Sequence, residues 1–259
     1  MVINPFYTKF QPNGWMVIFL LLLCVLMTDS YGQSPQKMVS LESIQQRYTG
    51  KWPQKISYIK KVDIRQYGRA DSSIQYHAYS YPQFGRVDQG SLDDGRAEII
   101  RGATSYSFKR FKKYSQGEAV KYFTNYMLGD IYYDDFAGLK KVLAYSQIDI
   151  NLQGTGTWEG RSVTIIGATS PDDRYNVQVW YDTEHLYPVR FIDGRTGRGV
   201  KDIQYHIKRY GGYWFPDSAK EFVNKKQVGT IRYENFSSDR KLPEEIFDTE
   251  RFGSYHWIQ

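Results

Sequence analysis

Cysteine is almost absent from this chain of 259 residues. The single cysteine, Cys24, lies inside an unbroken apolar run at 17–27, close to the N-terminus. If export removes that segment, the mature chain has no disulfide, no thiolate nucleophile and no cysteine-ligated metal. We therefore expect an apolar core alone to hold the domain together.

Long hydrophobic runs are scarce as well. The run at 17–27 is about half as long as the roughly 20 residues that a membrane-spanning helix needs. Its length is typical of the core of a secretory signal peptide, and Lys9 supplies the positive charge expected before such a core. The run therefore predicts export, with an uncleaved membrane anchor as the alternative.

Small residues after this run place the cleavage site. Ser30 and Gly32 stand three positions and one position before Gln33, which is the pattern that signal peptidase requires. We predict a signal peptide over 1–32 and a single mature domain over 33–259.

Cys24 is a second candidate for processing, as the acylated residue of a lipoprotein. Acylation needs a cysteine just after the apolar core, with a small residue before it. Here Leu23 precedes the cysteine and Val25 continues the apolar run. Lipoprotein anchoring through Cys24 is therefore disfavoured.

Motifs that carry chemistry are also lacking. The four histidines are never at metal-ligand spacing, and His77 and His206 fall on the polar sides of predicted strands, which predicts surface positions. No G-x-S-x-G elbow occurs, and the glycine-rich segment 154–160 has the wrong spacing for a dinucleotide loop and favours a hairpin turn at Glu159 and Gly160. We predict no catalytic residue, no metal and no cofactor. A carboxylate pair drawn from separate strands leaves a hydrolase as an alternative.

Basic residues outnumber acidic ones, giving a net charge of +6, but the charges are interspersed. The densest basic segment is 109–113, with the sequence Lys-Arg-Phe-Lys-Lys. Export argues against nucleic acid as a partner. An anionic membrane surface fits better, since each basic residue near such a surface contributes about 1 kcal/mol. A solvated strand end is the simpler interpretation of the same segment.

Aromatic residues, by contrast, are abundant, at 17% of the chain with 23 tyrosines. A flat amphipathic ring suits a half-buried sheet. Apolar and polar residues alternate over 56–111 and again from 148 nearly to the C-terminus, with turn residues between the runs. These patterns predict a mainly β (α+β) fold, with about 11–12 strands joined by tight turns into one strongly curled antiparallel sheet.

Helical spacing interrupts this alternation in two places. Residues 40–50 have the pattern of a short N-terminal helix capped by Ser40. Between about 117 and 146, apolar residues recur at helical spacing. We predict a mid-chain helical pair there, joined near 129–130.

A series of short motifs combines strand ends with aromatic turns. In order, they are 128–133 (LGDIYY), 158–163 (WEGRSV), 165–168 (IIGA), 177–182 (VQVWYD), 186–190 (LYPVR), 213–216 (YWFP) and 242–247 (LPEEIF). This order resembles the outer-membrane lipoprotein-sorting proteins, the superfamily of LolA-like carriers. The resemblance spans most of the mature chain.

The resemblance implies an unclosed β half-barrel with the helical pair covering its concave face. In that family the cavity between sheet and helices binds lipid or lipoprotein acyl chains. The implied location is the periplasm of a diderm bacterium, and the implied role is transport in outer-membrane biogenesis. The family's signatures provide no catalytic residue.

Apolar residues of the helical pair, with two tryptophans at strand ends, are the candidates to line such a cavity. They are Tyr122, Phe123, Tyr126, Met127, Phe136, Leu139, Leu143, Trp158 and Trp214. Ordinary core packing is the alternative for each. The alternative functions are an envelope module that binds a protein partner or senses stress, and a hydrolase acting on envelope polymer.

Processing is directly testable. We expect the intact mass of the exported protein to correspond to a chain that starts at Gln33, with or without cyclisation to pyroglutamate. A mature chain that starts at an acylated Cys24 would contradict this prediction.

Overall fold

The computed structural model describes residues 38–66, 68–121, 123–195, 197, 199–238, 240–254 and 257. The predicted signal peptide, its cleavage site, Cys24 and the candidate residue Tyr122 lie outside the described residues. All described residues belong to one compact unit, Lys37–Gln259. Within them, no helix is long and apolar enough to cross a membrane.

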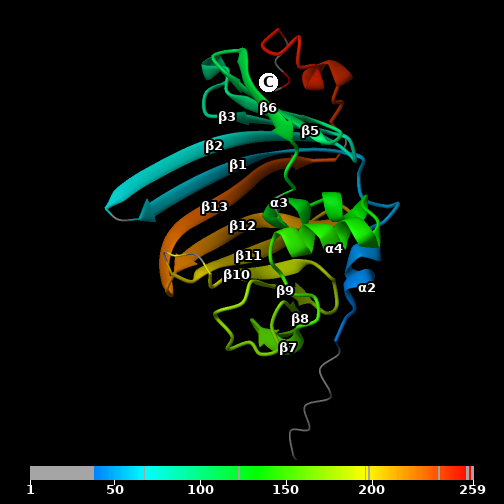
Figure 1. The fold of residues 1–259 in the computed structure, drawn as a ribbon, viewed down its shortest axis with the longest axis vertical. Coiled ribbons are helices and arrows are strands. Elements are labelled where there is room, and N and C mark those ends of the chain that lie inside the picture. The colour runs from blue at the N-terminus through cyan, green and yellow to red at the C-terminus, as the bar shows by residue number, and fades with distance from the viewer. Residues whose placement is uncertain are drawn as a thin grey trace, which may run out of the picture. The chain divides into compact units, whose positions relative to one another are not determined.

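Thirteen strands form a single antiparallel sheet that does not close into a barrel (Figure 1). The first half of the chain supplies β1 (Lys55–Gln66), β2 (Arg69–Ser80), β3 (Phe84–Gln89), β4 (Ala97–Arg101), β5 (Thr104–Lys109) and β6 (Lys112–Glu118). The second half supplies β7 (Gln153–Trp158), β8 (Arg161–Ile166), β9 (Gln178–Asp182), β10 (Pro188–Asp193), β11 (Lys201–Tyr210), β12 (Tyr213–Val223) and β13 (Lys226–Ser237). The predicted fold class is confirmed, with slightly more strands than expected.

The sheet consists of two meanders, β1 to β6 and β7 to β13. They are joined where β1 pairs with β13, for example at Val62 opposite Ile231. The two edge strands, β6 and β7, follow each other in the chain but lie at opposite edges of the sheet. The connection between them must therefore cross the sheet, and it carries the helices of the predicted pair.

Tight turns keep consecutive strands next to each other. The β7–β8 hairpin turns at Glu159 and Gly160, with φ angles of 48° and 78°, which confirms the predicted turn. The β12–β13 hairpin turns at Asn224 and Lys225, which also have positive φ. Positive φ at both central residues is type I′ geometry, whose twist matches that of paired strands.

Helix α2 (Leu41–Gln46) is the predicted N-terminal helix. Its Ser40 cap accepts a hydrogen bond from the backbone N–H of Ser43 at 3.1 Å, which satisfies one of the unpaired donors at the helix start. Leu41 and Ile44 lie on one face and are buried in the core.

The mid-chain pair differs from the expectation in its first member. Helix α3 (Phe123–Tyr126) is a single turn and is followed by the 3-10 helix η2 (Asp130–Tyr132). Strand β6 continues to Glu118, so few residues remain before Gly129 for a longer helix. The second member, α4 (Phe136–Tyr145), begins after Asp135, whose carboxylate accepts the N–H of Gly138 at 2.6 Å. Figure 1 shows α3 and α4 lying across the sheet.

The main core lies between the concave face of the sheet and these helices. Alternate strand residues enter it: Tyr79 of β2 belongs to this core, whereas its neighbour Ala78 belongs to a cluster on the other face. His77 is also buried, at 2% exposure, and stacks on Tyr58 with ring centroids 4.5 Å apart. Its predicted surface position is wrong, because an aromatic partner on β1 covers the ring. Burial, with the charge of Lys60, lowers the pKa of His77 well below its usual value.

The other predicted surface histidine, His206, is confirmed as exposed, with 70% of its side chain accessible. It lies on β11, and its ring lies near the carboxylate of Asp217. The polar side of a strand is therefore solvated here, whereas the equivalent side of β2 is covered.

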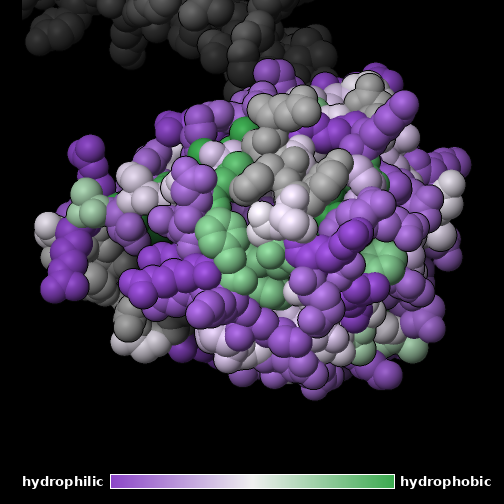
Figure 2. All heavy atoms as spheres, turned by 90° about the horizontal axis from the view of Figure 1, so that it is seen from above, coloured by the Kyte–Doolittle hydropathy of each residue, from purple (hydrophilic) through white to green (hydrophobic). Residues whose placement is uncertain are grey.

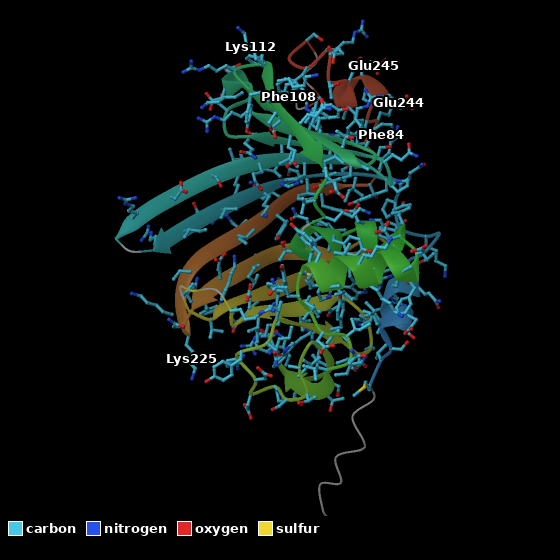
Figure 3. All side chains as sticks on the ribbon, viewed as in Figure 1. Phe84, Phe108, Lys112, Lys225, Glu244 and Glu245 are labelled. Atoms are coloured by element: carbon cyan, nitrogen blue, oxygen red, sulfur yellow. The ribbon has the colours of Figure 1, made fainter. Side chains whose placement is uncertain are left out.

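The convex face is covered near β2–β5 by the C-terminal segment, which includes the 3-10 helix η3 (Glu244–Phe247). Phe84 of β3 stacks on Phe247 with centroids 5.6 Å apart, and Figure 3 shows Phe84 beside Glu244 and Glu245. Seen from above, this end of the molecule is mostly hydrophilic, with hydrophobic side chains gathered near its middle (Figure 2). A further short 3-10 helix, η1 (Leu92–Asp94), connects β3 to β4.

A buried ion pair fixes this C-terminal segment to the sheet. The guanidinium of Arg86 donates to both carboxylate oxygens of Asp88 at 2.9 Å and to the carbonyl of Ile246 at 2.8 Å. The indole N–H of Trp257 donates to the same carboxylate at 3.0 Å. Both charged side chains are 5% exposed or less.

Removal of this carboxylate is expected to be costly. Asp88→Ala leaves Arg86 buried without its counterion, so we expect the free energy of unfolding to fall by about 3–5 kcal/mol. Asp63→Ala is the matched control, because Asp63 pairs with Arg232 while both are about half exposed, and it is expected to cost less than about 1 kcal/mol. Urea denaturation measures both. Equal losses would contradict the assigned role of the buried pair.

Candidate functional site

An open cavity of about 640 Å³ lies on the concave side of the sheet, between strands β2–β4 and the segment 118–145. We call it the apolar cavity, because apolar side chains form most of its wall. These include Tyr79, Val87, Ile100, Ala119, Val120, Tyr126, Val142 and Tyr145.

Strand alternation explains the sheet side of this wall. Val87 and Ile100 come from the neighbouring strands β3 and β4, at positions that face the concave side. Both are half-buried rather than packed into the main core. Gly85, opposite Ile100, leaves room for Tyr79: a Cβ at Gly85 would lie 3.1 Å from that ring.

The helix side of the wall comes from α4 and the chain that precedes α3. Val142 of α4 is nearly buried, whereas Val120 and Tyr145 are 38% and 65% exposed. Val120 and Tyr145 thus contribute exposed apolar surface to the cavity wall, alongside exposed polar residues such as Glu118 and Lys141.

A column of tyrosines connects the cavity to the helices. The ring of Tyr81 stacks on Tyr79 on one side, with centroids 5.4 Å apart, and on Tyr133 on the other, at 5.0 Å. Gly129 permits this approach, since a Cβ there would lie 2.1 Å from the Tyr81 hydroxyl oxygen. The segment that carries η2 is therefore held against the sheet by ring stacking.

Charged groups from the segment around α3 and η2 also contribute to the cavity wall. The ammonium of Lys121 binds both carboxylate oxygens of Asp134, at 2.9 and 3.0 Å. Asp130 also lines the cavity. Burial raises the pKa of Asp130 to about 6, with Lys121 opposing and Asp134 reinforcing the shift. Asp130 is thus a carboxyl that changes its charge near neutral pH, next to an apolar wall.

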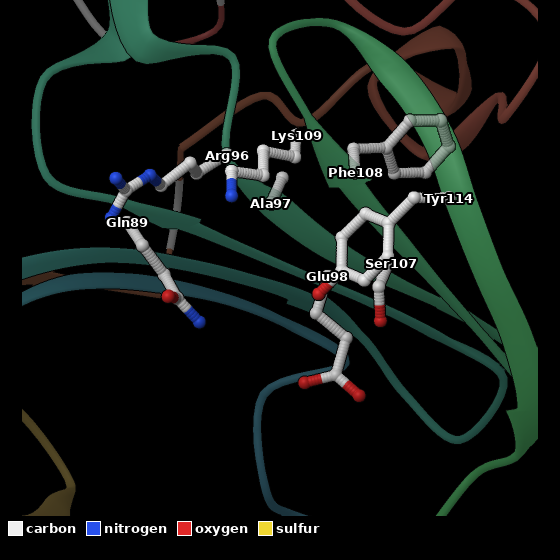
Figure 4. A pocket seen from close by; sticks show the side chains of 8 residues that line it. All are labelled: Gln89, Arg96, Ala97, Glu98, Ser107, Phe108, Lys109 and Tyr114. Carbon is white, nitrogen blue, oxygen red and sulfur yellow. The ribbon is translucent and has the colours of Figure 1, made fainter.

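A second hollow, of about 360 Å³, lies on strands β3–β6. We call it the polar hollow, and its wall consists of Gln89, Arg96, Ala97, Glu98, Ser107, Phe108, Lys109 and Tyr114 (Figure 4). Glu98 belongs to the walls of both the polar hollow and the apolar cavity. The two spaces therefore adjoin.

The structure brings one of the predicted cavity residues to the apolar cavity, namely Tyr126. Phe123, Met127, Leu139 and Leu143 are buried in the main core instead, at 3% exposure or less. Phe136 packs against the same core, and the ammonium of Lys140 lies 4.5 Å from its ring centroid.

The two predicted tryptophans lie elsewhere. Trp158 packs edge-on against Trp180, with the Arg190 guanidinium over both rings, in a cluster on the convex face of β8–β10. Trp214 stacks on His185 beside that cluster, with centroids 4.8 Å apart. Strand alternation places both rings away from the apolar cavity.

Several cavity residues were not among the sequence candidates, notably Val87, Ile100, Ala119 and Val142. Val142 follows Leu139 at helical spacing and also belongs to the main core, so the periodicity marks this face of α4 but not the part of it that reaches the cavity. Val87 and Ile100 lie in short strands whose alternation fits either a core or a cavity wall.

The described residues contain no cluster of three or more histidine, cysteine, aspartate or glutamate side chains that could hold a metal ion.

The mostly apolar wall of the cavity, with a few charged groups on it, supports binding of a mainly apolar molecule.

Comparisons with known proteins bear on the fold. No protein-family model and no curated protein sequence matches this chain. Among solved structures, it is similar to a LolA superfamily protein from Nitrosomonas europaea, with a TM-score of 0.54 and 14% identity over 81% of this chain and 98% of the other.

Two further solved structures give the same result. A putative outer-membrane lipoprotein-sorting protein domain from Vibrio parahaemolyticus has a TM-score of 0.55 and 13% identity. A DUF1329 family protein from Desulfovibrio piger has a TM-score of 0.55 and 14% identity. Each similarity covers 82% of this chain and 95% of the other. The chain therefore has a LolA-like fold, as the sequence motifs predicted.

The ionisation of Asp130 predicts how stability depends on pH. Its pKa is higher in the folded state than in the unfolded state, so the stability that protonation adds is present at low pH and is lost as pH rises through about 6. Asparagine does not ionise, so Asp130→Asn avoids the fall in stability that ionisation of the buried carboxyl causes. We expect the free energy of unfolding of the variant to exceed that of the wild type at pH 8 by on the order of 2 kcal/mol. The difference should shrink as pH falls to 5, as measured by urea denaturation.

Asp173 provides a control of opposite sign. Desolvation is the largest single effect and raises its pKa, but the hydrogen bonds from the backbone of Asn176 and Tyr175 and from the Asn176 side chain, with the charge of Arg174, together outweigh it and lower the pKa. We expect Asp173→Asn to be less stable than the wild type at pH 8. If the difference in free energy of unfolding between wild type and Asp130→Asn does not change with pH, the raised pKa assigned to Asp130 is refuted.

Proposed function

We propose that this LolA-like half-barrel is a non-enzymatic periplasmic carrier that binds an acyl chain of a lipid or lipoprotein in the apolar cavity. The observation that carries the proposal is the cavity itself, an open space of about 640 Å³ with a mostly apolar wall. Binding pockets for small molecules have volumes of roughly 300–1,000 Å³ and walls of this kind.

The fold gives a physical reason for such a space. A curled sheet has an apolar concave face that must be covered by side chains, helices or a ligand. Helices α2, α3 and α4 cover it over β1 and β9–β13, where the main core lies. Toward β3 and β4 this cover is incomplete, and Val87 and Ile100 face the cavity instead.

An acyl chain suits this space energetically. Each buried methylene contributes about 0.8 kcal/mol, and removal of the exposed cavity wall from water adds to this. Val120 and Tyr145 place exposed apolar surface on the cavity wall, which a chain can contact as it enters. The predicted signal peptide supports action in the periplasm.

Native mass spectrometry of the protein purified from its own periplasm tests the general proposal. Co-purification of lipid supports the carrier. If the protein carries no lipid, and binds no acyl probe after extraction with organic solvent, an envelope protein-interaction module becomes the better interpretation of the same fold.

A single substitution on the cavity wall tests the site. In Ile100→Glu, a charge replaces a half-buried apolar side chain and meets hydrocarbon when a chain is bound, which is unfavourable. In the empty cavity water can solvate the carboxylate, so we expect the variant to fold. The Kd for a fluorescent fatty acid is expected to rise about tenfold or more, as measured by fluorescence titration.

The matched control is Ile74→Glu. Ile74 is also a half-buried isoleucine on a strand of the same sheet, but it does not line the cavity. We expect this variant to retain wild-type affinity. Equal loss of affinity in both variants would argue against the apolar cavity as the binding site.

A further inference from the structure

The polar hollow continues the apolar cavity along the concave side of the sheet. Glu98 of β4 lies opposite Val87 of β3 and opposite Ser107 of β5. Val87 lines the apolar cavity, Ser107 lines the polar hollow, and Glu98 lines both. In Figure 4 the side chains of Glu98 and Ser107 lie on one side of the sheet, whereas Phe108 turns to the other.

Two cations give the polar hollow its character. Arg96 and Lys109 are exposed side chains on its wall. Within the described ranges, neither has a carboxylate at ion-pair distance. Neither is therefore held in an ion pair, and two cations against the single carboxylate of Glu98 on the same wall favour an anionic group such as a phosphate.

Neutral hydrogen-bonding groups complete the hollow. Gln89, Ser107 and Tyr114 supply an amide and two hydroxyls on the same wall. These groups can donate to oxygens of a polar group that the cations hold. The hollow thus differs chemically from the apolar cavity that it adjoins.

Glu98 marks the boundary between the two spaces. Its carboxylate accepts a hydrogen bond from the Ser105 hydroxyl, so it is held in place from the neighbouring strand. A negative charge at this boundary repels an anion that would move toward the apolar cavity. The apolar cavity has only the exposed Lys141 and the paired Lys121 on its wall, whereas two cations without ion pairs line the polar hollow, so an amphiphile is favoured with its anionic end in the hollow.

We propose that the polar hollow is the headgroup subsite of the carrier, and that the ligand is an amphiphile with a phosphate-bearing headgroup and an acyl chain. This inference rests on the proposed function, because the chain of the same ligand occupies the apolar cavity. Arg96 and Lys109 bind the phosphate, and Glu98 sets the orientation.

The β5–β6 hairpin extends the positive charge beyond the hollow. Lys109 ends β5, and Lys112 and Lys113 begin β6. Figure 3 shows Lys112 at this end of the sheet. The local positive potential raises the concentration of anionic ligands near the polar hollow.

Matched ligands separate the headgroup from the chain. The probes are lysophosphatidylglycerol, a monoacylglycerol of the same chain length, and glycerol 3-phosphate, each titrated by isothermal calorimetry below its critical micelle concentration. We expect the wild type to bind the lysophospholipid more tightly than the monoacylglycerol, and glycerol 3-phosphate most weakly. Added salt should weaken binding of the lysophospholipid and leave the affinity for the monoacylglycerol nearly unchanged.

The double variant Arg96→Ala/Lys109→Ala removes the two cations. We expect it to lose about tenfold or more in affinity for the lysophospholipid and to bind the monoacylglycerol as the wild type does. The control is Lys225→Ala/Lys226→Ala. It removes the same charge at the β12–β13 hairpin turn, and Figure 3 shows Lys225 far from Phe108 of the hollow. It should leave both affinities unchanged.

The outcomes distinguish this inference from the proposed function. The headgroup subsite is refuted if both double variants lose the same affinity for the lysophospholipid. It is also refuted if Arg96→Ala/Lys109→Ala loses the same affinity for both lipids. In either case the carrier stands. If the wild type binds no monoacylglycerol and no lysophospholipid, the proposed function itself falls. Binding of glycerol 3-phosphate as tight as that of the lysophospholipid would assign the hollow to a soluble phosphate ester and overturn the inference.

Discussion

The pairing of β1 with β13 is the constraint on which the rest of the structure depends. It joins two meanders into one sheet and so sends β6 and β7, which are neighbours in the chain, to opposite edges. The segment between them has to cross the sheet, and it does so on the concave side. Strand order thus supplies a covering segment, whose helices need little intrinsic stability because the aromatic core holds them.

The same constraint explains why the cover is incomplete. One turn of α3, the short η2 and the ten residues of α4 cannot mask thirteen strands. Ring stacking through Tyr79, Tyr81 and Tyr133 ties the crossing segment to the sheet at one place. Beyond that column the sheet continues to β6, and its concave side holds first the apolar cavity and then the polar hollow.

Local patterns were sufficient to predict the sheet but not the cavity. The turn at Glu159 and Gly160 and the cap at Ser40 depend on neighbouring residues alone, and both are confirmed. Leu139 and Val142 share a face of one helix and both belong to the main core, yet only Val142 also lines the cavity. That difference arises from tertiary packing, which periodicity does not encode. Trp158 shows the same limit, since an aromatic strand residue fits either face of a sheet.

The position of β13 also determines when the structure can form. Ser57 and Ser237 are paired although they lie about 180 residues apart in sequence, and the last strand occupies the middle of the sheet. During synthesis from the N-terminus, β1 emerges with one edge open and stays so until β13 follows. Open edges template aggregation, and such distant contacts form slowly. The sheet can therefore be completed only after β13 (Lys226–Ser237), and with it most of the chain, has been made.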